Sequence, residues 1–142
     1  MFLLDSDHLS ILWYNEGIEY DALLKRINSH AEEAFAVSIV TFDEQLRGWQ
    51  AYVKKSSRRD GTVKGYAELH RLLDRFSESQ VIDVDDTAAD KFIELRSQGV
   101  RIGSMDLRIA SIAIINDFTL LTRNTIDFER VPSLRFEDWT QV

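Results

Sequence analysis

Short apolar runs alternate with amphipathic stretches along the whole chain. The runs with the length of buried strands are residues 2–4, 34–40, 81–84, 118–122 and 134–136. The stretches with apolar residues at helical spacing are residues 8–14, 20–27, 44–52, 66–76, 87–98 and 106–116. This alternation predicts an α/β fold: a three-layer sandwich whose central, mostly parallel sheet of about five strands is flanked by helices.

Three local features refine this picture. Residues 44–52 and 66–76 are separated by a break near residues 56–61, which predicts a long helical hairpin. Residues 106–116 are apolar on nearly every side, which predicts an almost wholly buried helix. Thr41 follows the second run and offers a hydroxyl that could cap the next helix.

Composition narrows the class of protein. The 142 residues are 44% hydrophobic and 29% charged, as in an ordinary globular protein, and no repeat or linker interrupts them, so we expect a single domain over residues 1–142. The chain has no cysteine, which excludes disulfides and thiolate chemistry. Its N-terminus has neither a basic region nor a long apolar stretch, so we expect a cytoplasmic protein with no membrane span.

Charge is distributed unevenly along the chain. The net charge of -7 argues against a protein that coats nucleic acid non-specifically, because neutralising phosphates requires a surplus of Lys and Arg. Basic residues nevertheless gather in and around the predicted hairpin, namely Arg47, Lys54, Lys55, Arg58 and Arg59. They are either a solvated helical surface or a rim that faces phosphates.

Acidic residues stand at the edges of the apolar runs, far apart in the sequence. These are Asp5, Glu44, Asp106 and Asp127. The carboxyl ends of strands in an open α/β sheet border the crevice where ligands bind, so these side chains are expected to converge there. Asp5 and Asp106 could instead be helix N-caps, and Asp127 could stabilise a turn. A capping role explains Glu44 less well, because its neighbour Asp43 already offers a carboxylate to the same helix.

Carboxylates that meet in this way would repel one another. Two unit charges about 4 Å apart cost about 4 kcal/mol at an effective dielectric constant of about 20. Mg²⁺ or Mn²⁺ would relieve the repulsion, because both ions prefer carboxylate and water oxygens. A divalent metal site is therefore expected.

Groups of residues in a fixed order carry a resemblance that spans nearly the whole chain. In chain order they are Phe2-Leu3-Leu4-Asp5 with Leu9-Ser10, Ser38-Ile39-Val40-Thr41 with Glu44, Met105-Asp106-Leu107 with Ile109-Ala110, Thr122-Arg123-Asn124 with Asp127-Phe128, and Val131-Pro132-Ser133-Leu134 with Trp139. Together they resemble the PIN-domain ribonucleases and, among these, the VapC-type toxins. Residues 51–79 are the least typical stretch.

The resemblance implies metal-dependent hydrolysis of RNA phosphodiester bonds at a site made of the four acids. Asp5 and Asp106 would be direct ligands of Mg²⁺ or Mn²⁺, and Glu44 and Asp127 would complete the shell. It also implies a PIN-like fold, a cognate antitoxin protein that covers the site, and a homodimer built on the helical flank of the sheet.

Other polar residues near these motifs have supporting roles in this interpretation. Thr122 and Asn124 would orient the ligands or contact phosphate, and Asp7 is a weaker candidate for the same task. The histidines have no zinc-binding spacing, and surface or capping roles are expected for His8, His30 and His70. The helical spacing of Trp49 and Tyr52 favours a core or interface role over base stacking.

Two alternatives stay open at the level of sequence. The chain could be a catalytically silent PIN-like module that binds RNA or a protein. Asp5-Ser6-Asp7 after an apolar run also resembles the aspartate pair of haloacid-dehalogenase-type phosphatases, although Leu9 stands where that motif expects Thr or Val. The later lysine and paired acids of that family are not evident.

Overall fold

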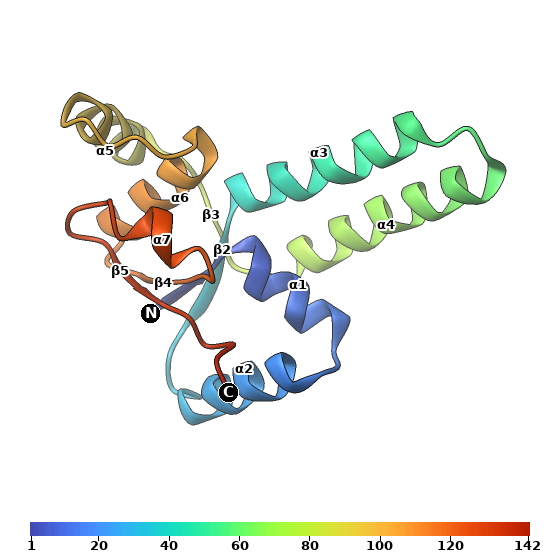
Figure 1. Cartoon of the computed structure of the whole chain (residues 1–142), viewed down its shortest axis with the longest axis horizontal. Coiled ribbons are helices and arrows are strands. Elements are labelled where there is room, and N and C mark those ends of the chain that lie inside the picture. The colour runs from blue at the N-terminus through green and yellow to red at the C-terminus, as the bar shows by residue number, and fades with distance from the viewer.

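The computed structural model describes residues 1–142 as a five-stranded sheet with helices on both faces (Figure 1). The strands are β1 (Phe2–Leu4), β2 (Phe35–Ser38), β3 (Val81–Ile82), β4 (Thr119–Leu121) and β5 (Arg135–Glu137). Their order in the sheet is β3-β2-β1-β4-β5, and every neighbouring pair is parallel. The predicted three-layer α/β sandwich is confirmed, with a sheet that is wholly parallel.

Helices make all the long connections between the strands. They are α1 (Ser6–Tyr14), α2 (Ile18–Ser29), α3 (Ile39–Lys55), α4 (Arg59–Ser77), α5 (Asp86–Ser97), α6 (Ser104–Ile115) and α7 (Thr125–Phe128). Figure 1 shows α3 and α4 as the predicted hairpin, which extends well away from the sheet. Helix α6 is the buried helix that its sequence predicts, and none of the helices has the length and apolar character to cross a membrane.

Strand β1 shows how side-chain alternation builds two hydrophobic cores. Leu3 faces one side of the sheet and packs with side chains from α5 and α6. Phe2 and Leu4 face the other side and pack with α1, α2, α4 and the C-terminal Trp139. A strand covered on both faces must be apolar throughout, so the first polar residue, Asp5, falls at the carboxyl edge of the sheet.

Two of the predicted strands extend two residues too far, since the third strand ends at Ile82 rather than at residue 84. The second strand ends at Ser38 rather than at residue 40, and Ser38 caps α3 in place of Thr41, because the Ser38 hydroxyl accepts a hydrogen bond from the Thr41 N–H at 3.0 Å. Ile39 and Val40 are β-branched, which favours a strand, but Val40 is buried in the core from the first turn of the helix. Glu44 consequently lies in the second turn of α3.

Candidate active site

The carboxyl ends of the neighbouring strands β1 and β4 join residues that lie 117 positions apart. The Asp5 N–H donates to the Leu121 carbonyl at 2.9 Å, and the Thr122 N–H donates to the Glu137 carbonyl at 2.9 Å. These backbone bonds continue the ladder one residue past each strand. Asp5 and Thr122 therefore lie side by side, and Thr122 Oγ1 donates to Asp5 Oδ2 at 2.8 Å.

Asp5 is both a helix cap and a buried acid of the site. Its Oδ1 accepts a hydrogen bond from the Ser6 N–H at 2.8 Å and caps α1, as one interpretation of the sequence suggested. The residue is only 6% exposed. Burial and the nearby Asp7 carboxylate raise the pKa of Asp5 to about 6, against the opposing effect of the bonds from Thr122 and Ser6. Capping alone therefore does not describe this carboxylate.

The side-chain amide of Asn124 connects two further acids. Its Nδ2 donates to Asp127 Oδ2 at 3.0 Å and to Asp106 Oδ2 at 3.4 Å. Burial and the charge of Asp127 raise the pKa of Asp106. Asp106 lies in the first turn of α6 but does not cap the helix, because the N-cap is Gly103. The capping alternative for Asp106 is therefore wrong.

Glu44 reaches the same region from α3. Its Oε1 is buried and has no hydrogen-bond partner. Burial and the charges of Asp5 and Asp106 raise the pKa of Glu44 to about 7, which shows that the three acids interact. No three acidic or histidine side chains lie close enough together to hold one ion as they stand. The acids are thus close enough to influence one another's pKa but do not form a closed set of ligands.

This group has the chemistry of a divalent cation site. Its donors are carboxylate oxygens, one of which, Glu44 Oε1, has no partner in the protein. The raised pKa values of Asp5, Glu44 and Asp106 show that ionising these groups is costly when no positive charge lies among them. A hard cation would remove that cost, so the residues fit the predicted metal.

Asp7 lies at the border of the site and pairs with His8, a residue whose buried role the sequence did not reveal. Its Oδ2 accepts a hydrogen bond from the Arg123 N–H at 2.9 Å, and its Oδ1 pairs with His8 Nδ1 at 2.7 Å. His8 is fully buried, and its Nε2 accepts from the Trp139 N–H at 3.1 Å. The expected surface or capping role of His8 is wrong. Residues near His8 in the sequence carried no signal of this, because the partner Trp139 lies 131 positions away.

The basic residues predicted to face RNA lie along the hairpin. Arg47 follows Glu44 by one turn of α3 and pairs with Asp43 at 3.0 Å. The other basic residues lie at the far end of α3 and at the connection to α4, and all are exposed: Lys54, Lys55, Arg58 and Arg59. Their contact with RNA stays a prediction.

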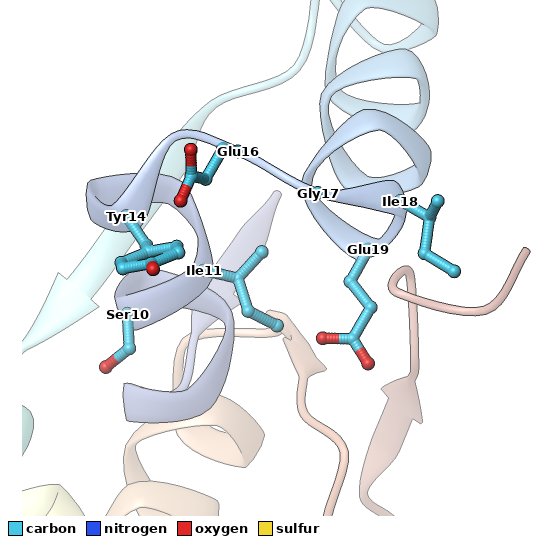
Figure 2. A pocket seen from close by; sticks show the side chains of 7 residues that line it. All are labelled: Ser10, Ile11, Tyr14, Glu16, Gly17, Ile18 and Glu19. Atoms are coloured by element: carbon cyan, nitrogen blue, oxygen red, sulfur yellow. The ribbon is translucent and has the colours of Figure 1, made fainter.

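Three surface hollows have lining residues on α1, and only one of them includes a predicted site acid. The first, of about 500 Å³, lies where α1 gives way to α2. Figure 2 shows that its lining comes from the end of α1 and the start of α2, and it includes none of the predicted site acids. The hollow that includes a site acid, of about 420 Å³, is lined by Ser6, Glu44, Gln45, Gly48, Trp49 and Tyr52. Glu44 makes this hollow continuous with the acidic site.

Comparison with known proteins agrees with this geometry. The model of the PIN domain family matches residues 3–134. The chain belongs to the PIN-domain family. Ribonuclease VapC2 of Rickettsia felis is 40% identical over 108 residues, which cover 73% of each chain. The tRNA(fMet)-specific endonuclease VapC of Salmonella typhimurium is 34% identical over 127 residues, which cover 82% of this chain and 89% of that relative.

Solved structures give the same family relationship. The crystal structure of VapBC2 from Rickettsia felis bound to a promoter DNA fragment contains a chain that matches with a TM-score of 0.70 and 27% identity, over 97% of this chain and 98% of that chain. The resemblance to PIN-domain ribonucleases of the VapC type is thereby confirmed. Nucleases of this family are generally metal-dependent. Because the chain belongs to the PIN-domain family, the haloacid-dehalogenase-type phosphatase alternative no longer applies.

Proposed function

We propose that this chain, as one nuclease domain over residues 1–142, is an endoribonuclease toxin that hydrolyses RNA phosphodiester bonds with Mg²⁺ or Mn²⁺. The observation that carries the proposal is the gathering of acids from separate elements, Asp5 after β1, Glu44 on α3 and Asp106 on α6, close enough to other carboxylates that their charge raises the pKa of each. A fold that served stability alone would not keep such repulsion. Perturbed acids gathered in this way are typical of functional sites.

In this proposal the acids hold the metal. Asp5 and Asp106 would hold it directly, and Glu44 and Asp127 would complete the shell directly or through water. The ion, when bound, polarises the scissile phosphate and lowers the pKa of a coordinated water. Glu44, whose buried Oε1 has no partner within the protein, would orient water beside the phosphate through its carboxylate.

Neighbouring polar groups keep the acids in position. The Thr122 hydroxyl and the Ser6 N–H fix the two oxygens of Asp5. The Asn124 amide holds Asp127 and Asp106 against their mutual repulsion. Such supporting hydrogen bonds orient metal ligands and are needed for full activity.

The proposal extends to protein partners. The Rickettsia felis relative was crystallised as the VapBC2 complex. By analogy, we propose that an antitoxin covers the site of this chain in the cytoplasm and that a basic side chain of that antitoxin pairs with the free carboxylates. We also propose that the chain forms a homodimer on the helical flank of the sheet.

The experiment is a cleavage assay with purified protein, RNA and Mg²⁺ or Mn²⁺. Cleavage should stop when the metal is chelated. Asp5→Asn should lower the rate by more than the roughly 10- to 100-fold that loss of a supporting residue costs. Asp21→Asn, an exposed acid on α2, is the matched control and should cut normally.

Each failure has its own meaning. Unchanged cutting by Asp5→Asn would point to a contaminating nuclease and refute the site. Wild-type protein that binds RNA but never cuts it would support the silent PIN-like module instead.

A further inference from the structure

The hollow beside Glu44 has features that metal-dependent hydrolysis does not explain. We refer to it as the Trp49 groove, lined by Ser6, Glu44, Gln45, Gly48, Trp49 and Tyr52. Except for Ser6 at the start of α1, these residues lie on α3. Because Glu44 also belongs to the acidic site, a group in the groove would lie next to the phosphate being cut.

Gly48 keeps part of this groove open. A Cβ at position 48 would meet no atom within 4 Å, and the surrounding backbone is ordinary α-helix. Gly65 on the facing helix α4 is different, since a Cβ there would lie 2.3 Å from Val53 Cγ2. Packing therefore requires glycine at 65 but not at 48, where glycine weakens the helix. What Gly48 provides is space beside Trp49.

Two buried polar atoms of the groove lack partners. They are Ser6 Oγ and Glu44 Oε1, and no other buried side-chain nitrogen or oxygen in the structure is unpaired. Buried polar atoms are nearly always hydrogen-bonded in native proteins. Both exceptions belong to residues at the end of the groove where α1 meets α3, and both atoms are covered from solvent. This end of the groove is polar, whereas Trp49 and Tyr52 form an aromatic wall.

The aromatic wall of the groove consists of Trp49 and Tyr52, which contact each other and a lysine of α4. The rings of Trp49 and Tyr52 meet edge to face, with centroids 5.4 Å apart and an angle of 73°. Lys64 Nζ on α4 lies 5.9 Å from the centre of the Tyr52 ring. Neither aromatic residue belongs to the two hydrophobic cores, and Tyr52 is 38% exposed. The two rings thus contact each other and are still partly open to solvent.

We propose that the Trp49 groove binds one unpaired nucleobase of the RNA, adjacent to the scissile phosphate. The base stacks on Trp49, and the Gln45 amide bonds to its polar edge. Stacking on aromatic rings and edge recognition are how proteins read single-stranded RNA. The inference rests on the proposed ribonuclease function and adds a contact to it: a base that flanks the cut occupies the Trp49 groove.

Filling the groove tests this directly. Gly48→Leu places a side chain in the space without meeting protein atoms at its Cβ, and leucine favours the helix. Gln50→Leu, exposed on the same helix and outside the groove, is the control. Each protein is assayed with Mn²⁺ on single-stranded RNA oligonucleotides that vary at the nucleotides flanking the cut. Each is also assayed on bis(4-nitrophenyl) phosphate, a phosphodiester without bases.

For Gly48→Leu we expect a KM for RNA about tenfold higher, in line with the loss of one stacked base, and a flatter preference among flanking nucleotides. Hydrolysis of the base-free diester should be unchanged, and Gln50→Leu should match wild type on both substrates. Trp49→Phe should retain most of the RNA affinity, whereas Trp49→Ala should lose it, because Phe keeps a stacking face.

The outcomes separate the two proposals. If Gly48→Leu has the same RNA kinetics as wild type, the groove does not bind a base. Its occupant would then be a protein partner. An equal loss on both substrates would also overturn base binding, since the substitution would then act on the acids. If wild type hydrolyses neither substrate, the ribonuclease function fails and the groove inference falls with it.

Discussion

The carboxyl edge of the sheet and the α3–α4 hairpin carry opposite charges and hold them in different ways. At the edge, Asp5 is buried and receives hydrogen bonds on both carboxylate oxygens. On the hairpin, which projects away from the sheet in Figure 1, Lys54 and Lys55 are exposed at the end of α3. Groups that share a small ion need fixed positions, whereas groups that attract a polyanion can remain solvated.

The largest difference in stability is expected between replacing His8 at the carboxyl edge of the sheet and replacing His70 on the hairpin. His8→Leu should leave Asp7 Oδ1 and the buried Trp139 N–H without partners and lower the free energy of unfolding by about 2–5 kcal/mol. His70→Leu, an exposed position on α4, should change it by no more than about 0.5 kcal/mol. Urea denaturation measures both. Equal effects would mean that the edge is no more tightly held than the hairpin.

A smaller effect on stability is expected when the partly buried Glu44, rather than an exposed glutamate, is replaced and the pH is varied. Glu44 has a pKa of about 7 in the fold against an ordinary value of 4.5, so the folded state holds its proton more tightly than the unfolded state. Without metal, wild type should therefore lose stability relative to Glu44→Gln as the pH rises from about 4.5 to about 7. The difference should level off at about 2 kcal/mol, less than the full shift implies, because the Glu44 side chain is partly exposed.

Denaturation in chelator over this pH range provides the measurement. Glu78→Gln, at the exposed end of α4, is the matched control and should stay within about 0.5 kcal/mol of wild type throughout. A wild type that gains stability relative to Glu44→Gln with rising pH would contradict the repulsion among the acids.

The smallest effect is expected on RNA binding, when two lysines of the hairpin are replaced. Lys54→Gln combined with Lys55→Gln should leave kcat unchanged and weaken the salt dependence of RNA binding. The slope should fall by about 0.7 for each phosphate that the variant no longer neutralises. Lys25→Gln, exposed on α2, should leave the slope as in wild type. A double variant with the wild-type slope would remove the hairpin lysines from the RNA-facing surface.

The sequence predicted the sheet and the acids for the same physical reason. A strand buried on both faces must be apolar, so its end is marked by the first polar residue, as Leu4 followed by Asp5 shows. The end of the second strand was misplaced because Ile39 and Val40 have strand propensity, yet Val40 is buried from a helix. Tertiary packing decides such cases, and local pattern does not report it.

Features that depend on contacts between distant residues could not be predicted from the sequence. The burial of His8 depends on the backbone of Trp139, at the other end of the chain. The Trp49 groove exists because α1 and α3 meet at Ser6 and Glu44, which no spacing along the chain predicts. The sequence could name the acids but not the surface beside them.

The most direct test of a cation-stabilised acidic site is thermal unfolding of Asp106→Asn and wild type, in chelator and in Mn²⁺. In chelator the variant should melt no lower than wild type, because it removes a charge that Asp127 repels. Mn²⁺ should then raise the melting temperature of wild type more than that of the variant. A variant that melts far below wild type in chelator, and gains equally from Mn²⁺, would show that Asp106 is structural and that no shared metal site exists.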